Sequence, residues 1–337
     1  MGAWATESPA DPCFDPRFNA WILSRYRDVA AALREVRLIP VLAGSSTPAV
    51  PVDSAVHAEF RSQALRALAP ARLQELEARF ASVADPMAGA LPTDQPVDLV
   101  EQYARPWSLQ VAGIAADVPA GQCERLSGLA RRVFDAACEP YDPAFAAAAR
   151  KATAELARFF HGAPPLNLQM FIALTHSLAA FLGNAWLALL EHPAELAVLR
   201  QDSSLLPKAI DELLRLAGPA KAQFRQAVAP VTIRGCEIQR DRHVVLRVDI
   251  ANRDAEQFPN PDQLQFDGRS TGHLAFGTGL HACVASSLIK SAAAVATKAL
   301  LYRCHFAEQY SAVPADCFAM RYVKSLTVVV QAGGRSL

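Results

Sequence analysis

The residues best suited to chemistry lie in one short segment. From 276 to 285 the sequence reads Phe-Gly-Thr-Gly-Leu-His-Ala-Cys-Val-Ala, directly before a predicted helix. Gly277 and Gly279 allow the backbone to turn sharply around a bulky, flat group. Cys283 stands at the expected helix N-terminus, where unpaired N–H groups and the helix dipole stabilise a thiolate. A buried cysteine beside an ordinary glycine loop is the alternative, but the two glycines, His281 and the helix together favour a cysteine ligand site.

The other cysteines predict no disulfide framework. The chain contains seven cysteines, an odd number, and no two have the Cys-x-x-Cys spacing of a zinc or redox site. This set fits a reducing compartment better than an oxidising one. The cysteines are Cys13, Cys123, Cys138, Cys236, Cys283, Cys304 and Cys317.

Composition and charge exclude several classes of protein. Among 337 residues, 33 Lys and Arg balance 33 Asp and Glu, so the formal net charge is zero. A neutral chain has no long-range attraction for nucleic acid or for an anionic membrane surface. Because 52% of the residues are apolar, the chain can bury a substantial core, which a disordered chain cannot do. We therefore expect a compact enzyme or ligand-binding protein without a nucleic-acid partner.

Periodicity places most helices early in the chain and most strands late. Residues 1–20 look irregular, a strand follows at Ala20–Ser24 with a helix after it, and 40–51 is a loop rich in Pro, Ser and Gly. Alternating residues predict a short β-meander over 224–250 and a last strand within 321–331. The order predicts an α+β, mainly α fold with a single domain over 1–337. Further helices are predicted at 54–80 with a break near Ala69-Pro70, and at 97–117, 120–139, 144–160, 193–201, 207–216 and 284–302.

The longest apolar segment, residues 170–190, is long enough to cross a membrane. Thr175-His176-Ser177 and Gly183-Asn184 interrupt it, whereas a lipid-exposed helix needs continuous apolar character. We therefore expect a long helix buried in protein and no membrane span. The N-terminus lacks a basic region followed by an apolar stretch, which predicts no signal peptide and a cytoplasmic location.

The segment 276–285 resembles the heme-binding loop of the cytochrome P-450 superfamily, whose pattern is Phe-Gly-x-Gly-x-(His/Arg)-x-Cys-x-(Gly/Ala). Other segments agree with that family in the same order, so the resemblance runs from about Trp21 to the C-terminus. They are HAEFR at 57–61, GNAWLALLEHP at 183–193, the Glu-x-x-Arg of Glu212 and Arg215, and ANRD at 251–254 followed by FPNPD. The chain is identified as a member of that superfamily, of the soluble bacterial type and unusually short.

The resemblance implies a role for each matching residue around a heme b. Cys283 would be the axial thiolate of the iron, within a loop that includes Phe276 and Gly277. The heme propionates would be held by His57, Arg61, Arg225 and His281, since buried carboxylates need cationic or donor partners.

The Glu-x-x-Arg pair is implied to belong to a buried structural network. In the family, Glu212 and Arg215 would be joined by a downstream arginine. This sequence has Gln263 at the expected place, and Arg253 or Arg269 is the expected substitute.

Two departures from the family bear on function. The shortfall in length is expected at the N-terminus and between about Cys138 and Leu168, where the family has two lid helices, which predicts an open or partner-covered distal face. On the distal helix, His176 takes the position of the family's acid, Ser177 that of its alcohol, and Leu174 that of a glycine. His176 and Ser177 are therefore the candidate proton-delivering residues. The alternative is that His176 is a hydrogen-bonded residue in a packed helix.

The function implied is that of a monooxygenase which oxidises a small apolar or secondary-metabolite substrate, free or tethered to a carrier protein, with electrons from a ferredoxin. The altered distal residues favour a second hypothesis of atypical chemistry: peroxide-driven oxidation, dehydration, rearrangement or nitrogen-centred bond formation. A non-catalytic heme binder is the third. Because the changed residues and the bulk of Leu174 impair proton delivery, we expect much of the reductant to be lost as peroxide.

Overall fold

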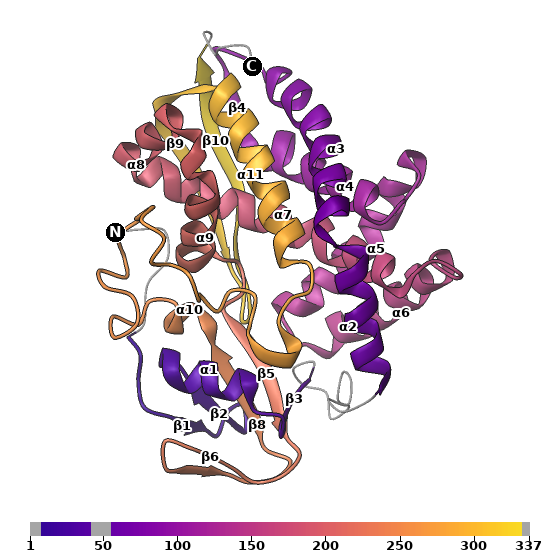
Figure 1. Ribbon diagram of the computed structural model, residues 1–337, viewed down its shortest axis with the longest axis vertical. Helices are drawn as coiled ribbons and strands as arrows, with labels where there is room; N and C mark the ends of the chain where they lie inside the picture. The colour runs from indigo at the N-terminus through magenta and orange to yellow at the C-terminus, as the bar shows by residue number, and fades with distance from the viewer. Residues whose placement is uncertain (1–7, 42–54, 332–337) are drawn as a thin grey trace.

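The fold joins a large helical part to a smaller part built around a five-stranded sheet, which lies at the lower end of the molecule in Figure 1. The structure, a computed structural model, describes residues 8–41 and 55–331. Most of the described chain between β3 (Leu38–Pro40) and β5 (Ala222–Ala227) is helical, and strands lie mainly before and after it, which confirms the predicted α+β, mainly α class. The loop predicted at 40–51 lies almost entirely outside the described residues.

Each predicted helix is present, although the one after Ala69 continues past the predicted end at 80 to Gly89, and the long helix begins at Pro165 rather than at 170. Many have proline in the first turn, where its missing N–H costs no hydrogen bond. The predicted break near Ala69-Pro70 separates α2 from α3. The helices are α1 (Tyr26–Arg34), α2 (Ala55–Ala67), α3 (Pro70–Gly89), α4 (Arg105–Ala115), α5 (Ala120–Cys138), α6 (Pro143–Phe159), α7 (Pro165–Glu191), α8 (Pro193–Gln201), α9 (Leu206–Ala217), α10 (Val248–Ala251) and α11 (Ser286–Arg303).

The five-stranded sheet has the strand order β1-β2-β8-β5-β3. Strand β2 runs parallel to β8, whereas the other neighbouring pairs are antiparallel. The predicted meander is therefore wrong, because β5 pairs directly with β8 while β6 and β7 form a separate two-stranded sheet. The strands are β1 (Cys13–Asp15), β2 (Ala20–Leu23), β3 (Leu38–Pro40), β5 (Ala222–Ala227), β6 (Val231–Ile233), β7 (Cys236–Ile238) and β8 (His243–Arg247).

Two corrections concern strands that were expected to be irregular or helical. Strand β1 lies inside the N-terminal segment expected to be irregular, where it pairs with β2. A second, three-stranded sheet has the order β4-β10-β9, from β4 (Pro96–Asp98), β10 (Arg321–Gln331) and β9 (His305–Asp316). Strand β4 falls where a helix was predicted to begin. It is too short to show a period, and pairing with β10 decides its conformation.

Helix α7 is the central helix of the larger part. It is apolar and long enough to cross a membrane, but 78% of its most apolar window is buried inside the protein. It packs against α4, α5, α9 and β10. Asn184 on this helix donates from its amide to the carbonyl of Ala217 and accepts from the N–H of Val323. The interruption of the apolar run thus fixes α7 to α9 and β10.

Helices α5 and α6 form a packed pair beside α7, seen on the right-hand side of Figure 1. Asp142 caps α6 by accepting from the N–H groups of Ala144 and Phe145. Residues 138–168 therefore contain the helix predicted at 144–160, and the predicted openness of the distal face stays a prediction. The short connection is the one between α6, which ends at Phe159, and α7, which begins at Pro165.

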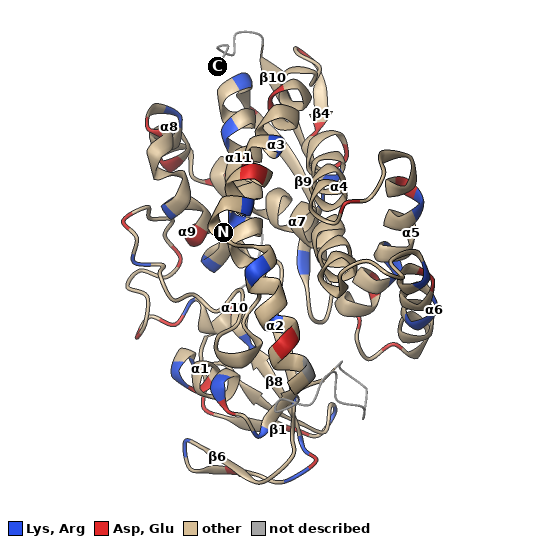
Figure 2. Cartoon of the chain, turned by 45° about the vertical axis from the view of Figure 1, so that its right-hand side comes forward, with Lys and Arg blue, Asp and Glu red and all other residues tan. Residues whose placement is uncertain are grey.

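Charged residues are interspersed in sign over the surface. Figure 2 shows Lys and Arg alternating with Asp and Glu on the outer sides of α1, α2, α5 and α6. Several form ion pairs within one turn or between neighbouring helices, as Arg72 does with Glu75 and Arg125 with Glu155. These pairs are exposed, and pairs of this kind contribute little to stability.

Candidate functional site

The glycine–cysteine segment forms a closed loop directly before α11. The N–H of Cys283 donates to the carbonyl of Phe276 at 2.9 Å, which joins the two ends of the loop. Gly277 and Gly279 have φ angles of 68° and 77°. A Cβ at Gly279 would lie 3.2 Å from the backbone of Leu33 and Arg34 at the end of α1. Both glycines are thus required by backbone conformation, and the second also by close packing.

Cys283 is partly buried against the main core, and its surroundings disfavour a free thiolate. Burial raises the pKa of the thiol, although an N–H from Ala285 and the charge of Arg61 act in the opposite direction. Desolvation is thus the larger effect on this pKa, and the N–H of Ala285 is the part of the helix terminus that favours the thiolate. A bound metal cation deprotonates a coordinating thiol outright, so this sulfur is suited to binding metal rather than to acting as a free nucleophile.

Buried cationic and imidazole groups converge beside the loop. Arg225 on β5 is 4% exposed, and burial lowers the pKa of its guanidinium to about 10. Burial, followed by the nearby charges of His57, Arg225 and Arg61, lowers the pKa of His281 to about 4. Arg225 Nε and His281 Nε2 are buried without a hydrogen-bond partner among the residues that the structure describes. Such groups are costly unless an anionic or acceptor partner meets them.

Two further predicted residues complete this cluster. The ring of His57 on α2 lies 4.7 Å from the ring of His281. Arg61, one turn later on α2, donates to the carbonyl of Ala282 at 2.7 Å. The structure thus brings all four predicted propionate partners to one side of the loop, although Arg61 also supports the loop backbone.

The sequence reasoning missed Gln223. Its side-chain oxygen accepts from Arg225 at 3.1 Å, and its amide group lies where a Cβ on Gly277 would reach it. The available signal was strand periodicity, because residues two apart on β5 point to the same face. Gln223 orients the arginine and helps to fill the inner side of the loop.

Helix α7, which carries the candidate proton-delivering residues, has two small residues on one face. Ala173 is exposed and Ser177 half-buried, and four residues apart they share a face of α7. Leu174 is fully buried in the core instead. Leu174 thus packs into the main core, and that it fills the space of the family's glycine stays a prediction.

His176 lies in a packed environment between α7 and α5. Its Nε2 hydrogen-bonds the carbonyl of Ser127 at 3.0 Å, and its ring lies 5.8 Å from that of Phe134. Burial lowers the pKa of His176 below its ordinary value, so the imidazole is neutral at pH 7 and Nε2–H is the donor. This geometry agrees with the hydrogen-bonded alternative for His176.

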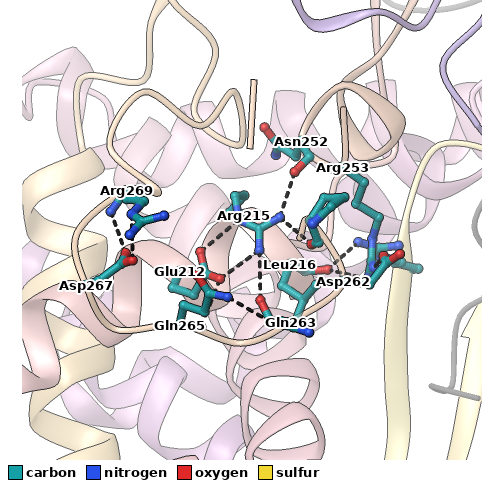
Figure 3. Close-up of polar contacts among 12 residues, drawn as sticks. Glu212, Arg215, Leu216, Asn252, Arg253, Asp262, Gln263, Gln265, Asp267 and Arg269 are labelled. Atoms are coloured by element: carbon teal, nitrogen blue, oxygen red, sulfur yellow. Dashed lines mark hydrogen bonds and ion pairs between the residues drawn. The ribbon is translucent and has the colours of Figure 1, made fainter. Parts of the chain in front are cut away.

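The Glu212–Arg215 pair of α9 forms a buried network, shown in Figure 3. Two nitrogens of Arg215 each lie 2.7 Å from Glu212 oxygens, with both side chains at most 4% exposed. Arg215 also donates to the carbonyls of Asn252 and Pro261, at 2.9 and 2.7 Å. The N–H of Gln265 donates to Glu212 at 3.2 Å.

Neither expected substitute takes the place of the third arginine. Arg253 donates to the Leu216 carbonyl and pairs with Asp262, while Arg269 is exposed and pairs with Asp267. The expectation of a substituting arginine was therefore wrong. Backbone groups around Gln263 and Gln265 close the network instead, because the loop runs directly over Glu212.

The site can hold a flat, largely apolar group with acidic substituents at one edge. Arg225 Nε and His281 Nε2, which have no hydrogen-bond partner among the described residues, suit carboxylates. The Cys283 sulfur suits a soft or borderline metal. Gly277 and Gly279 have no side chain, so the backbone of the loop can approach a flat group closely. These residues therefore fit a heme with its iron at the sulfur and its propionates at the cations.

Comparison with known proteins agrees with this geometry. Residues 198–321 match the family model named cytochrome P-450. The chain is 30% identical over 329 residues to the vitamin D(3) 25-hydroxylase of Pseudonocardia autotrophica, covering 86% of this chain and 81% of that one. It is 28% identical over 346 residues to the monooxygenase PikC of Streptomyces venezuelae, covering 88% and 81%.

Solved structures match the fold along almost the whole chain. The crystal structure of CYP109E1 from Bacillus megaterium in complex with corticosterone superposes with a TM-score of 0.81 at 21% identity, covering 95% of each chain. That of P450BioI with an acyl carrier protein bearing a fatty acid gives a TM-score of 0.80 at 22% identity. With its relatives, its fold and its loop in agreement, this chain belongs to the cytochrome P-450 family and is a heme b-dependent oxidoreductase of the bacterial type.

Proposed function

We propose that this protein is a monooxygenase that oxidises a small apolar substrate with electrons from a ferredoxin-type protein in the cytoplasm. The observation that carries the proposal is the convergence of the buried cations on the Cys283 loop. These groups suit a heme, and the stripe of Ala173 and Ser177 on α7 is proposed to leave room beside it for a substrate. The monooxygenases among its relatives support the reaction type.

In this proposal the chain's own residues bind and orient the cofactor. Cys283 Sγ ligates the iron, while His281 and Arg225 take the propionates, with His57 and Arg61 beside them. The heme supplies the activation of dioxygen, which no side chain can provide. Phe276 and Cys283 pack against the main core, which limits the access of water to the sulfur.

Replacing Arg225 by glutamine is expected to weaken heme retention by about thirty-fold or more. Removing one partner of a buried charge pair costs about 2–5 kcal/mol. The measurement is the rate at which the holoprotein loses heme to an excess of an apo-protein that captures it. Arg242→Gln is the matched control, because this arginine is exposed directly before the neighbouring strand β8 and contacts Asn19. Equal rates of loss for the two variants would contradict the assignment.

The substrate is proposed to be apolar and of moderate size, free or tethered. One relative is named as a hydroxylase of vitamin D(3), and a structural neighbour was crystallised with corticosterone. Another structural neighbour was crystallised with an acyl carrier protein that bears a fatty acid, which supports testing carrier-tethered substrates as well. The test is turnover with a ferredoxin and its reductase, under oxygen, against free and carrier-linked apolar metabolites. Absence of product from every member of such a panel would count against this reaction.

Ser177 is proposed to hold a proton at Oγ beside the reacting oxygen, with His176 as a residue that positions α7 against α5. Ser177 faces the exposed stripe, whereas His176 Nε2–H is used by Ser127. A serine hydroxyl is less fixed in rotamer than a threonine hydroxyl, so its placement is loose. Electrons are therefore expected to be lost largely as peroxide in the natural protein.

The ratio of product formed to reductant consumed tests these roles. Ser177→Thr is expected to raise the ratio several-fold, and Ser177→Ala to lower it about tenfold or more, since a positioned proton donor contributes at least that much. His176→Gln keeps a donor for the Ser127 carbonyl and is expected to leave the ratio nearly unchanged. Tight coupling in the natural protein that falls in Ser177→Thr would show that Ser177 belongs to an adapted relay.

A second candidate function is heme chemistry without reductive oxygen activation, such as peroxide-driven oxidation, dehydration, rearrangement or nitrogen-centred bond formation. The observation in its favour is that the residue in the acid position, His176, is neutral and committed to α5. Product formed with peroxide, or without any reductant, and not with ferredoxin and oxygen, would support this second function over the first.

A further inference from the structure

The end of α5 and the turn between β9 and β10 meet, although they are far apart in the sequence. The N–H of Ala319 donates to the carbonyl of Cys138 at 3.0 Å. The N–H of Phe318 donates to a carboxylate oxygen of Glu139 at 3.3 Å. Within the turn, the N–H of Cys317 donates to the carbonyl of Met320 at 3.0 Å, so the position of Cys317 is fixed by the turn itself.

Two cysteine thiols face each other at this junction. Cys138 is buried in a small apolar cluster with Phe134, Ala180 and Tyr322, and the half-buried Cys317 packs against the same cluster. The two thiols are close enough to act on each other's pKa, and the nearby Glu139 carboxylate raises the pKa of Cys317. The arrangement holds one shielded sulfur directly behind one that reagents can reach.

We propose that Cys138 and Cys317 form a reversible disulfide that fastens α5 to the β9–β10 turn. The oxidant is a low-molecular-weight disulfide. The Cys317 thiolate attacks one of its sulfurs and releases one thiol, and the Cys138 thiolate then attacks the mixed disulfide and releases the second. Two protein S–H bonds are lost and one S–S bond forms, while the oxidant is reduced to two thiols.

The order of attack follows from exposure, because only Cys317 is accessible to a reagent in solution. Burial raises the pKa of both thiols, and Glu139 raises that of Cys317 further, so few thiolates exist near neutral pH. The pair is therefore expected to close slowly when an oxidant accumulates.

The remaining contacts at the junction are ones that can separate. Four aromatic rings from four segments gather there. The ring centroid of Phe318 lies 4.8 Å from that of Phe18, 4.9 Å from that of Tyr141 and 6.2 Å from that of Phe224. Tyr141 lies in the turn between α5 and α6 and is 37% exposed. Ring contacts break and re-form when the turn moves, whereas a disulfide would not allow that movement.

A consequence for ligand entry rests on the proposed function. Helix α5 lies against α7 at His176, next to Ser177, so displacement of α5 uncovers that side of α7. Fastening α5 to the β9–β10 turn would hinder such displacement. Oxidation is therefore expected to slow the entry of ligands to the heme.

Peptide mapping of the oxidised holoprotein tests the disulfide directly. The natural protein and the variants Cys138→Ser, Cys317→Ser and Cys236→Ser are equilibrated with excess oxidised glutathione, alkylated and digested. A peptide linking Cys138 to Cys317 is expected in the natural protein and in Cys236→Ser, the control with a half-buried cysteine on β7. Its absence, or a preferred linkage through the exposed Cys13, would overturn the proposal.

The effect on entry has a separate readout. The rate at which imidazole binds the ferric heme, followed by absorbance, is expected to fall about tenfold on oxidation and to recover with dithiothreitol. Cys138→Ser should show no change. If the linked peptide forms and the rate is unchanged, control of entry is refuted while the disulfide stands. Neither measurement depends on turnover, so failure of the proposed reaction would be recognised separately.

Discussion

Replacement of Cys283 by serine is expected to abolish the red-shifted Soret band that carbon monoxide gives with the reduced holoprotein. That band would report a thiolate ligand of the iron, and Cys283 would be that ligand, at the end of the loop that Gly277 and Gly279 allow to turn. A serine hydroxyl does not ionise near neutral pH and donates far less electron density to iron. The loss should be complete rather than partial.

The other cysteines provide the matched controls. Cys304→Ser alters a buried thiol that contacts the Ala88 carbonyl at 3.7 Å, and Cys123→Ser a half-buried one on α5. Both variants should keep the band unshifted. A natural protein without the band, or a Cys283→Ser variant that retains it, would show that the iron has another ligand.

Arg215→Met is expected to destabilise the protein by about 3–5 kcal/mol, the cost of leaving a buried charge without its partner. Glu212 is 3% exposed. In the variant it would lose the two hydrogen bonds from Arg215 and keep the one from the N–H of Gln265. The measurement is the free energy of unfolding in urea at pH 7. The double variant Glu212→Leu with Arg215→Met should recover part of the loss, because the unpaired charge is then removed.

Arg269→Met is the control for this prediction. Its side chain is 69% exposed, and it pairs with Asp267 at 2.9 Å near the same network. An exposed pair contributes about 0–1 kcal/mol, so the variant should change stability little. A small effect of Arg215→Met, equal to that of Arg269→Met, would mean that the network contributes nothing to stability.

Local signals predicted the helices and the loop well. The positive φ angles at Gly277 and Gly279 favour glycine. The proline in the first turn of α7 marks the start of that helix without any contact to a distant segment. These features depend on a few neighbouring residues, which is why the sequence reveals them. The convergence of Arg225 with His281 came from family resemblance, since no local pattern joins β5 to the loop.

The features that were predicted wrongly depend on distant partners. Strand β4 exists because β10 pairs with it, and the closure of the Glu212 network depends on the path of the loop at Gln265.

The parallel pairing of β2 with β8 has a consequence for synthesis on the ribosome. Ala20 pairs with His243, so the five-stranded sheet cannot close until roughly two hundred further residues have been translated. At about 5–20 residues per second, that interval is about 10–40 s. During it, β2 has only β1 as a partner strand, and the faces of β2 and α1 that β8 later covers stay exposed. Because Arg225 lies on a strand of the same sheet, the nascent chain can acquire its cofactor only near the end of translation.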